Sequence, residues 1–397
     1  MTSATHRVLI IVENLPVPVD RRVWQEARAL RDAGYDVTVV CPQMRGYSTP
    51  FEVLDGITIY RHWIMHEASG VAGFLGEYAS ALWGEARCVL SAWRRKRFDV
   101  IHLCNPPDLL FLVALPFKLL GGVRVIYDVH DLCPELAELK FGKRGMMYWI
   151  ARVAERCTLR LADSVMTTNQ SVRAVVMRRG KKNDGEVFVV RTALDKQTTA
   201  PLAHPPLRNG KRYLVGYVGV MGKADGVNYL IEAAHHVVHV RGRQDVHFLL
   251  MGAGPEYARL LQQRDGLGLQ ECVGMPGHVS NEFLFAALGT MDLGVACDPI
   301  NDFNDHCTMN KTLDYMAFGK AQVMFGTREG RYSAGEAARY VMENSADQLG
   351  DAIIEVLDDE ASRRKMGEIG QRRLRTELSW EKSVEELLRT YRKALGQ

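Results

Sequence analysis

The sequence of 397 residues lacks the features that mark disulfide-linked, secreted or membrane-spanning proteins. Its eight cysteines are scattered singly and form no CxxC pair, as is typical of reduced thiols in a cytoplasmic protein. Its longest apolar run, LLFLVALPF, is far shorter than the roughly 20 residues that span a bilayer, and the apolar run near the N-terminus is too short for a signal peptide. We therefore expect a cytoplasmic protein.

Internal repeats, low-complexity segments and a strong net charge are also missing. The chain is 47% hydrophobic and 24% charged, as globular proteins are, and its length suggests two or three domains. The net charge of +3 is unevenly spread, because residues 1–200 carry +6 and the remainder carries −3. The basic half suits an anionic partner, such as a phosphate-bearing substrate or a lipid surface. No basic stripe with interleaved aromatic residues points to nucleic acid.

What the sequence does contain is an alternation of strand-like and helix-like patterns, which indicates parallel sheets covered by helices. RVLIIV at 7–12 predicts a buried strand, the segment DRRVWQEARALRDAGY predicts a helix that ends at Gly34, and DVTVVCP predicts a second strand. Together they form one βαβ unit. Further strands in this half are predicted at 100–103, 123–127 and 164–168.

The alternation is interrupted once, by KQTTAPLAHPPLRNGKR at 196–212, which is rich in proline and polar residues and lacks periodicity. We interpret it as a linker between one α/β domain at 1–195 and a second at 213–378. The second domain is expected to contain strands at 213–218, 247–251, 293–296 and 321–325, and helices at 227–240 and 256–263. Two such domains in tandem place a ligand cleft at the carboxyl ends of their strands.

Five motifs occur in a fixed order: PVDRRVWQEARALRDAGYDVTVVCP, YDVHD, GVMGKADG, MGAGPE and MNKTLDYMAFGK. As an ordered set they resemble glycosyltransferase family 4, and the resemblance extends to LSWEKSVEELLRTYRKAL near the C-terminus. It implies the GT-B fold, α/β with two Rossmann-like domains whose parallel sheets face across a cleft, and a helix at 379–397 that crosses back to the N-terminal domain. It also implies retaining transfer of a sugar from a nucleotide sugar, without a metal or other cofactor.

The turn from Gly219 to Gly226 follows a predicted strand and opens a helix. A nucleotide-diphosphate leaving group gains negative charge as the glycosidic bond breaks, so its site must supply hydrogen-bond donors and positive potential. Backbone amides in a glycine turn can approach phosphates, with Lys223 as a point charge. A plain strand-to-helix turn is the alternative, since the spacing is not GxGxxG. The donor-binding residues assigned to this turn are Gly219, Val220, Met221, Gly222 and Lys223.

The segment NDHCTMNKTLDYMAFGK predicts a helix capped by Thr308 or Asn310, whose first amides would point at the diphosphate. Lys311 in the first turn opposes the helix dipole, a cost that an anionic ligand would reverse. Asp314 is placed to accept hydrogen bonds from ribose hydroxyls. An ordinary capped helix with an incidental acid is the alternative. The remaining donor-binding assignments are His278, Cys307, Thr308, Met309, Asn310, Lys311 and Asp314.

The chain departs from the family pattern in this segment. Family members carry two glutamates separated by seven residues; here the second matches Asp314, while the first position is His306, with Asp305 beside it. We assign His306 as a catalytic residue that replaces the glutamate. Because the first family glutamate is missing, a protein that binds nucleotide sugars without catalysis is the alternative to an enzyme.

His130 in YDVHD follows a predicted strand, so it should lie at the carboxyl end of that strand. In the family the cleft histidine contacts the donor sugar, and we assign His130 as catalytic, against the alternative of a structural histidine. Asp131 and Asp128 are secondary candidates. Near the first helix, Asp20 is a good N-cap. We expect the two arginines in the first turn to face an anionic acceptor or the donor phosphates, and a solvated surface is the alternative. The acceptor-binding assignments are Asp20, Arg21, Arg22 and Asp131.

No metal site is predicted. His235 and His239 lie one helical turn apart but have no evident third ligand, and Asp298, Asp302 and Asp305 lack the spacing of a metal-binding carboxylate pair.

Two stretches bear on the acceptor. FLGEYASALWGEARCVLSAWRRKRF at 74–98 and LKFGKRGMMYWIARVAERC at 139–157 mix basic, aromatic and apolar residues, as helices at a membrane surface do, although helix packing is the alternative. We expect a hexose to pass from a UDP-sugar to a glycan or lipid-linked acceptor in surface polysaccharide or glycoconjugate biosynthesis, at the inner face of the membrane. A nucleotide-sugar epimerase or hydrolase of the same fold is the alternative enzyme.

Overall fold

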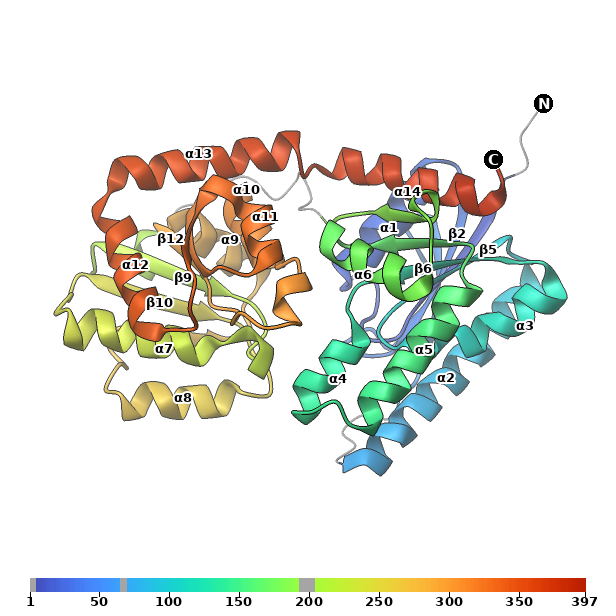
Figure 1. The fold of residues 1–397 in the computed structure, drawn as a ribbon, viewed down its shortest axis with the longest axis horizontal. Coiled ribbons are helices and arrows are strands. Elements are labelled where there is room, and N and C mark those ends of the chain that lie inside the picture. The colour runs from blue at the N-terminus through green and yellow to red at the C-terminus, as the bar shows by residue number, and fades with distance from the viewer. Residues whose placement is uncertain (1–4, 65–69, 193–203) are drawn as a thin grey trace. The chain divides into compact units, whose positions relative to one another are not determined.

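The computed structural model describes residues 5–64, 70–192 and 204–397, and the chain forms two compact α/β units. One unit contains Met1–Thr192 together with Trp380–Gln397, and the other contains Ala193–Ser379. Each unit has a central sheet with helices on both faces (Figure 1). Residues 196–203 of the predicted linker lie outside the described residues.

The first unit contains an eight-stranded sheet in the order β3-β4-β2-β1-β5-β6-β7-β8, parallel except for β3. The strands predicted in this half are confirmed, whereas β3, β4 and β8 were not predicted. The strands are β1 (Arg7–Val12), β2 (Asp36–Pro42), β3 (Phe51–Leu54), β4 (Ile57–His62), β5 (Val100–Cys104), β6 (Arg124–Val129), β7 (Ser164–Thr167) and β8 (Val187–Val189).

Both faces of this sheet are buried, which explains why its strands are nearly continuous apolar runs. Alternate residues of β1 enter two different cores: Leu9 and Ile11 on one face, Val8 and Ile10 on the other. The helices are α1 (Arg21–Asp32), α2 (Gly70–Arg95), α3 (Phe111–Gly121), α4 (Cys133–Phe141), α5 (Met146–Leu161), α6 (Gln170–Gly180) and α14 (Trp380–Leu395), with short helices η1 (Asp108–Leu110) and η2 (Asp184–Glu186).

The C-terminal helix α14 packs on the same face of this sheet as α1 (Figure 1). Its residues Leu387, Tyr391 and Ala394 are buried in the core that contains Val8 and Ile10. These three positions repeat at the spacing of one helical face, so the helix buries an apolar stripe against the sheet.

The second unit contains a six-stranded parallel sheet in the order β11-β10-β9-β12-β13-β14. The four strands predicted here are confirmed. The strands are β9 (Tyr213–Val218), β10 (Val246–Met251), β11 (Val273–Gly277), β12 (Leu293–Ala296), β13 (Ala321–Phe325) and β14 (Ala338–Val341). The helices are α7 (Val227–His235), α8 (Tyr257–Gly266), α9 (Asn281–Thr290), α10 (Asn310–Ala317), α11 (Arg328–Ala334), α12 (Ala346–Asp358) and α13 (Glu360–Thr376), with η4 (Pro205–Arg208), η5 (Lys223–Asp225), the π-helix η6 (His236–Val240), η7 (Asn304–His306) and η8 (Gly335–Ala337).

The strand order reverses its direction once in each unit. In the first unit β1 lies between β2 and β5, and in the second β9 lies between β10 and β12. Sheets of this kind bind ligands just outside the carboxyl ends of the strands at that reversal. The loops after β1, β5 and β6, and those after β9, β10 and β12, are therefore where site residues are expected.

Candidate active site

The loops after β9 and β10 in the second unit pack backbone against backbone. The amide of Gly219 donates to the carbonyl of Met251 at 3.1 Å, and the amide of Met221 donates to that of Ala253 at 3.1 Å. A Cβ on Gly252, which has a φ of +144°, would lie 1.8 Å from the Gly219 carbonyl oxygen. The glycines of GVMGKADG and MGAGPE thus allow a close approach that side chains would prevent.

Lys311 projects from α10 toward the glycine turn, where it forms a buried ion pair. Its Nζ donates to Asp298 Oδ1 at 2.7 Å and lies 3.8 Å from Asp225 Oδ1, while 6% of the residue is exposed. Burial would lower the pKa of this ammonium, but the two carboxylates outweigh burial and raise it. Lys311 is also 5.0 Å from the centre of the Tyr217 ring. Lys311, for which the sequence predicted compensation by an anionic ligand, is therefore already paired with carboxylates of the protein. A Cβ on Gly219 would lie 3.1 Å from its Cε.

The start of α10 differs from the sequence prediction. Met309, rather than Thr308 or Asn310, occupies the N-cap position, and it makes no side-chain cap hydrogen bond. The predicted cap is wrong because the chain is still extended at Met309, with φ −79° and ψ 115°. The helix therefore begins at Asn310, one residue later than a cap at Thr308 requires. The first backbone N–H groups of such a helix can still donate hydrogen bonds to an anion.

Tyr315 fixes α10 against the two strands at the reversal. Its hydroxyl donates to the Val295 carbonyl at 3.1 Å and accepts from the Val218 amide at 3.2 Å. The ring occupies space that a Cβ on Gly294 would enter, at 2.5 Å. One buried side chain thus sets the position of the helix start relative to the ends of β9 and β12.

The loop after β12 carries His306 in η7 and is tied to the glycine turn. The Nδ1–H of His306 donates to the carbonyl of Asp302 at 2.7 Å, and Asp305 accepts from the amide of Arg328 at 2.9 Å. Asn304, which sequence reasoning missed, donates from Nδ2 to the Ala224 carbonyl at 2.9 Å. Its position after a predicted strand was the available signal.

The other predicted donor-binding residues fall into two groups. Val220 and Lys223 are exposed residues within the turn, and Asp314 is 6% exposed in the second turn of α10. His278 is exposed at the end of β11, which lies two strands from β9. The structure therefore brings the turn, Lys311 and α10 together and leaves His278 apart from them.

In the first unit, His130 follows β6 and its imidazole is anchored by Asp128. His130 Nε2 lies 2.7 Å from Asp128 Oδ2, and 13% of the imidazole side chain is exposed. Burial would lower the pKa of His130, but the Asp128 carboxylate outweighs burial and raises it. The backbone amide of His130 donates to Asn105 Oδ1 at 2.6 Å.

Arg22 holds Asp128 from the other side. Its Nε and Nη2 donate to the two carboxylate oxygens at 2.8 and 2.7 Å, and its Nη1 donates to the Val190 carbonyl at 2.6 Å. Burial would raise the pKa of Asp128, but Arg22 and His130 together lower it well below its usual range. The expectation that Arg22 faces an acceptor is corrected, because the residue is 6% exposed and its guanidinium is paired.

The remaining predicted residues of this unit lie around the same loops. Asp20 caps α1 as predicted, since its Oδ1 accepts from the Val23 amide at 3.0 Å. Arg21 is exposed and Asp131 is half-buried. Asn105, which sequence reasoning missed, donates from Nδ2 to the Asp131 carbonyl at 2.8 Å. Its place at the end of β5, directly before two prolines, could have indicated its role.

One group within the described ranges could bring three metal ligands together: His102, Cys104 and Asp128, all buried. Asp128 is already engaged by Arg22 and His130. The rings of His235 and His239 are 5.0 Å apart at their centres, and His239 is exposed.

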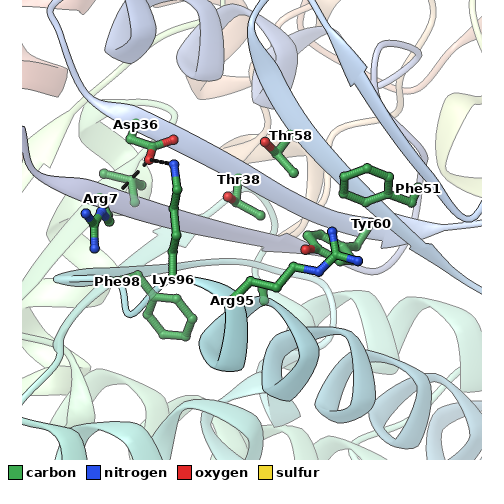
Figure 2. Close-up of a pocket in the computed structure, with 11 residues that line it drawn as sticks. Arg7, Asp36, Thr38, Phe51, Thr58, Tyr60, Arg95, Lys96 and Phe98 are labelled. Atoms are coloured by element: carbon green, nitrogen blue, oxygen red, sulfur yellow. Dashed lines mark hydrogen bonds and ion pairs between the residues drawn. The ribbon is translucent and has the colours of Figure 1, made fainter.

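A pocket of about 170 Å³ lies at the amino ends of strands in the first sheet, away from the carboxyl ends where site residues are expected (Figure 2). Its acid, Asp36, pairs with Lys96 at 3.0 Å and with Arg7 at 3.9 Å, and Arg95 lies 5.0 Å from the centre of the Phe51 ring. No predicted site residue lines this pocket. Among the described helices, none is long and apolar enough to cross a bilayer.

Comparisons with known proteins agree with this division of the chain. Residues 19–191 match the family described as Glycosyl transferase 4-like domain, and residues 212–359 match the family described as Glycosyl transferases group 1. Alpha-maltose-1-phosphate synthase of Mycolicibacterium smegmatis is 26% identical over 309 residues, which are 70% of this chain and 74% of that protein. Alpha-D-kanosaminyltransferase of Streptomyces kanamyceticus is 31% identical over 153 residues, 37% of this chain and 39% of that protein.

Solved structures resemble the whole chain. Sucrose-phosphate synthase from Thermosynechococcus elongatus has a TM-score of 0.81 at 17% identity and covers 98% of this chain and 99% of its own. Anabaena HepE in complex with UDP and glucose has a TM-score of 0.74 at 16% identity, with 97% and 99% covered. WaaG, a glycosyltransferase involved in lipopolysaccharide biosynthesis, has a TM-score of 0.71 at 13% identity, with 98% and 100% covered. At these identities the likeness establishes a shared fold.

Proposed function

We propose, from the premise that this chain is a glycosyltransferase with the GT-B fold, that it moves a sugar from a nucleotide-diphosphate sugar to a glycan or lipid-linked acceptor with retention. We propose a UDP-sugar as the donor, and a role in surface polysaccharide or glycoconjugate biosynthesis. The observation that carries the proposal is the arrangement in the second unit, where the glycine turn after β9, the start of α10 and buried Lys311 meet at the strand reversal.

This arrangement suits a diphosphate for electrostatic reasons. A leaving diphosphate gains negative charge as the bond to the sugar breaks, and preorganised donors stabilise that charge most when they need not reorient. The turn offers backbone close to a ligand without intervening side chains, and α10 offers the positive end of a helix dipole. Lys311 adds a cation, which is held in position by its hydrogen bond to Asp298 and by the packing of α10.

We propose that His130 of the first unit contacts the donor sugar. In same-face transfer, the bond from the anomeric carbon to the phosphate oxygen breaks as the acceptor oxygen bonds to that carbon. The departing phosphate oxygen takes the acceptor proton, so no separate base is required. His130 and His306 are then residues that hold and polarise the sugar, and Asp314 holds the ribose.

A lipid-linked acceptor is supported by an exposed stripe on α5. Four apolar side chains at the spacing of one helical face are exposed, by 41% to 68%, where a soluble helix would bury them. Exposed cations adjoin them. The stripe consists of Met146, Trp149, Ile150 and Val153, and the cations are Lys140, Lys143, Arg144, Arg156 and Arg160. On α2, Trp83 and Leu90 are similarly exposed by 68% and 41%. We propose that this face, most of all α5, contacts an anionic membrane surface.

Titration calorimetry with UDP-, GDP- and ADP-sugars, followed by product analysis, tests the function. We expect one nucleotide class to bind and a sugar to appear on the acceptor. Free sugar or an epimer would identify a hydrolase or an epimerase instead. If the protein binds a nucleotide sugar but forms no product with any of the glycans and lipid-linked sugars offered as acceptors, it is a nucleotide-sugar-binding protein.

A further inference from the structure

We propose that Asp128 is a positioning residue for His130: its buried carboxylate holds Nε2, so that the imidazole presents Nδ1 and its proton to the substrate. The inference rests on the proposed function only for the identity of that substrate. The arrangement itself follows from contacts within the first unit, and it extends from α1 through the sheet to the C-terminal helix.

The orientation of the ring follows from hydrogen-bond chemistry. An ionised carboxylate can only accept, so the 2.7 Å contact with Asp128 Oδ2 requires a hydrogen on His130 Nε2. That hydrogen is present in both the neutral and the charged imidazole. Nδ1 is therefore the nitrogen that gains or loses a proton, and a ligand oxygen at Nδ1 receives a hydrogen bond when the ring is charged.

Asp128 keeps its negative charge because cations and donors surround it. Arg22 forms two hydrogen bonds with the carboxylate, and His102 Nε2 lies 3.7 Å from Oδ2. Both Asp128 and His102 are 0% exposed. A carboxylate buried in this way is strongly constrained in position, since movement would break its two hydrogen bonds with Arg22, whose other acidic neighbour is Glu26 at 3.2 Å.

The C-terminal helix supports the far end of this chain of contacts. His102 Nδ1 lies 2.9 Å from the hydroxyl of Tyr391 on α14, while its Nε2 lies 3.7 Å from Asp128 Oδ2 and 3.9 Å from Glu26 Oε2. The arrangement is consistent if Tyr391 donates to Nδ1 and Nε2 carries the hydrogen toward the carboxylates. Tyr391 thereby selects the tautomer of His102 that stabilises the Asp128 charge.

The charged groups that face His130 come from several elements. Asp128 on β6 and Asp20 before α1 favour the charged ring, whereas Arg22 on α1 opposes it. Glu26 on α1 and Asp131 after β6 also interact with the ring. Asp128 is the group in direct contact, so we assign it the dominant influence, and the charged ring serves as a hydrogen-bond donor to a phosphate or hydroxyl oxygen rather than as a base.

Nuclear magnetic resonance of ring-¹⁵N-labelled histidine in the full chain tests this directly and needs no substrate. The His130 signals can be assigned with a His130→Gln variant. As the pH rises, we expect Nδ1 to lose its proton while Nε2 keeps its own, with a midpoint above the ordinary value of about 6.5. A neutral ring with the proton on Nδ1, or a midpoint below that of free histidine, would overturn the proposal.

Two variants sharpen the test. Asp128→Asn should lower the His130 midpoint by about one pH unit or more. Asp163→Asn, which removes a carboxylate paired with Lys118 at the opposite end of β6, should leave it unchanged. Tyr391→Phe should weaken the Nε2–H preference of His102. An unchanged His130 midpoint in Asp128→Asn would contradict the proposal, whereas absent glycosyl transfer would contradict only the proposed function.

Discussion

Individual residues in both units are held in buried charge pairs that local sequence patterns do not reveal. Lys311 pairs with Asp298, and Arg22 pairs with Asp128, 106 positions away in the sequence. Such pairs are costly to break, because each removed partner leaves a buried charge uncompensated. Substitutions at these positions will therefore change stability as well as function, and tests of function need exposed or isosteric variants.

Glu26 should make stability depend on pH. Burial raises the pKa of Glu26 from 4.5 to about 8. The folded protein then holds a proton at pH 7 that the unfolded chain has lost, so the stability from this group is full below pH 4.5 and disappears as the pH rises through 8. In Glu26→Gln the free energy of unfolding, measured by urea denaturation, should fall less between pH 5 and 8 than in the parent. Parallel curves would contradict this, and Glu385→Gln on the exposed side of α14 is the control.

Lys223 offers a cleaner test of diphosphate binding than Lys311. It is exposed within the glycine turn, so Lys223→Ala should leave the fold intact and weaken UDP binding by about 1 kcal/mol, or about fivefold. Lys311→Met should weaken UDP binding more and also lower the melting temperature, because Asp298 loses its partner. Calorimetry with UDP measures the first effect and thermal denaturation the second. UDP affinity equal to that of the parent in both variants would rule out this site.

Substitutions of His306 and Asp314 should affect different steps, turnover in the first case and nucleotide binding in the second. Asp314→Asn should reduce affinity for UDP and UDP-sugar alike, because the ribose is common to both. His306→Ala should leave UDP affinity nearly unchanged and lower kcat with the intact donor, since only the sugar would lose a contact. His306→Glu, which restores the family residue, should recover turnover if any hydrogen-bond acceptor suffices. Undiminished turnover in His306→Ala would remove this residue from the site.

At the scale of elements, the two helices that matter most for function are α10 and α5. Residues 311–316 of α10 are buried and its first residue, Asn310, is exposed, whereas α5 leaves an apolar stripe exposed. The start of α10 is fixed by Tyr315 against β9 and β12, which preorganises its first turn. The exposed stripe of α5 carries the opposite pattern to a buried helix, with Trp149 exposed by 61%. Both features depend on where the helices pack, and their sequences alone left packing alternatives open.

The α5 stripe should bind anionic lipid. The double variant Trp149→Ser and Ile150→Ser removes two exposed apolar side chains. We expect it to bind phosphatidylglycerol vesicles about tenfold more weakly than the parent in a co-sedimentation assay. Binding of the parent to phosphatidylcholine vesicles should be weaker, because their headgroups carry no net negative charge to attract the cations around the stripe. Val240→Ser with Met342→Ser, a pair of comparably exposed residues in the second unit, is the matched control. Equal loss in both double variants would indicate nonspecific adsorption.

At the scale of the whole molecule, the sequence predicted the parallel strands because each is an apolar run buried on both faces, as Leu9 and Ile10 illustrate. It missed the β3–β4 hairpin, whose turn residues Asp55 and Gly56 were an available signal. The contact between His102 and Tyr391, 289 residues apart, could not be predicted, since only the packing of α14 on the first sheet brings them together.

The proposed retaining transfer without a metal can be tested by the anomeric configuration of the product and by the effect of EDTA on its formation. Purified full-length protein is incubated with the α-linked UDP-sugar that calorimetry selects and a panel of glycans and lipid-linked sugars, in the presence of EDTA. Proton magnetic resonance then reports the configuration of the new linkage. We expect an α-linked product that forms at an undiminished rate in EDTA. A β-linked product, or transfer that EDTA abolishes and Mn²⁺ or Mg²⁺ restores, would contradict it.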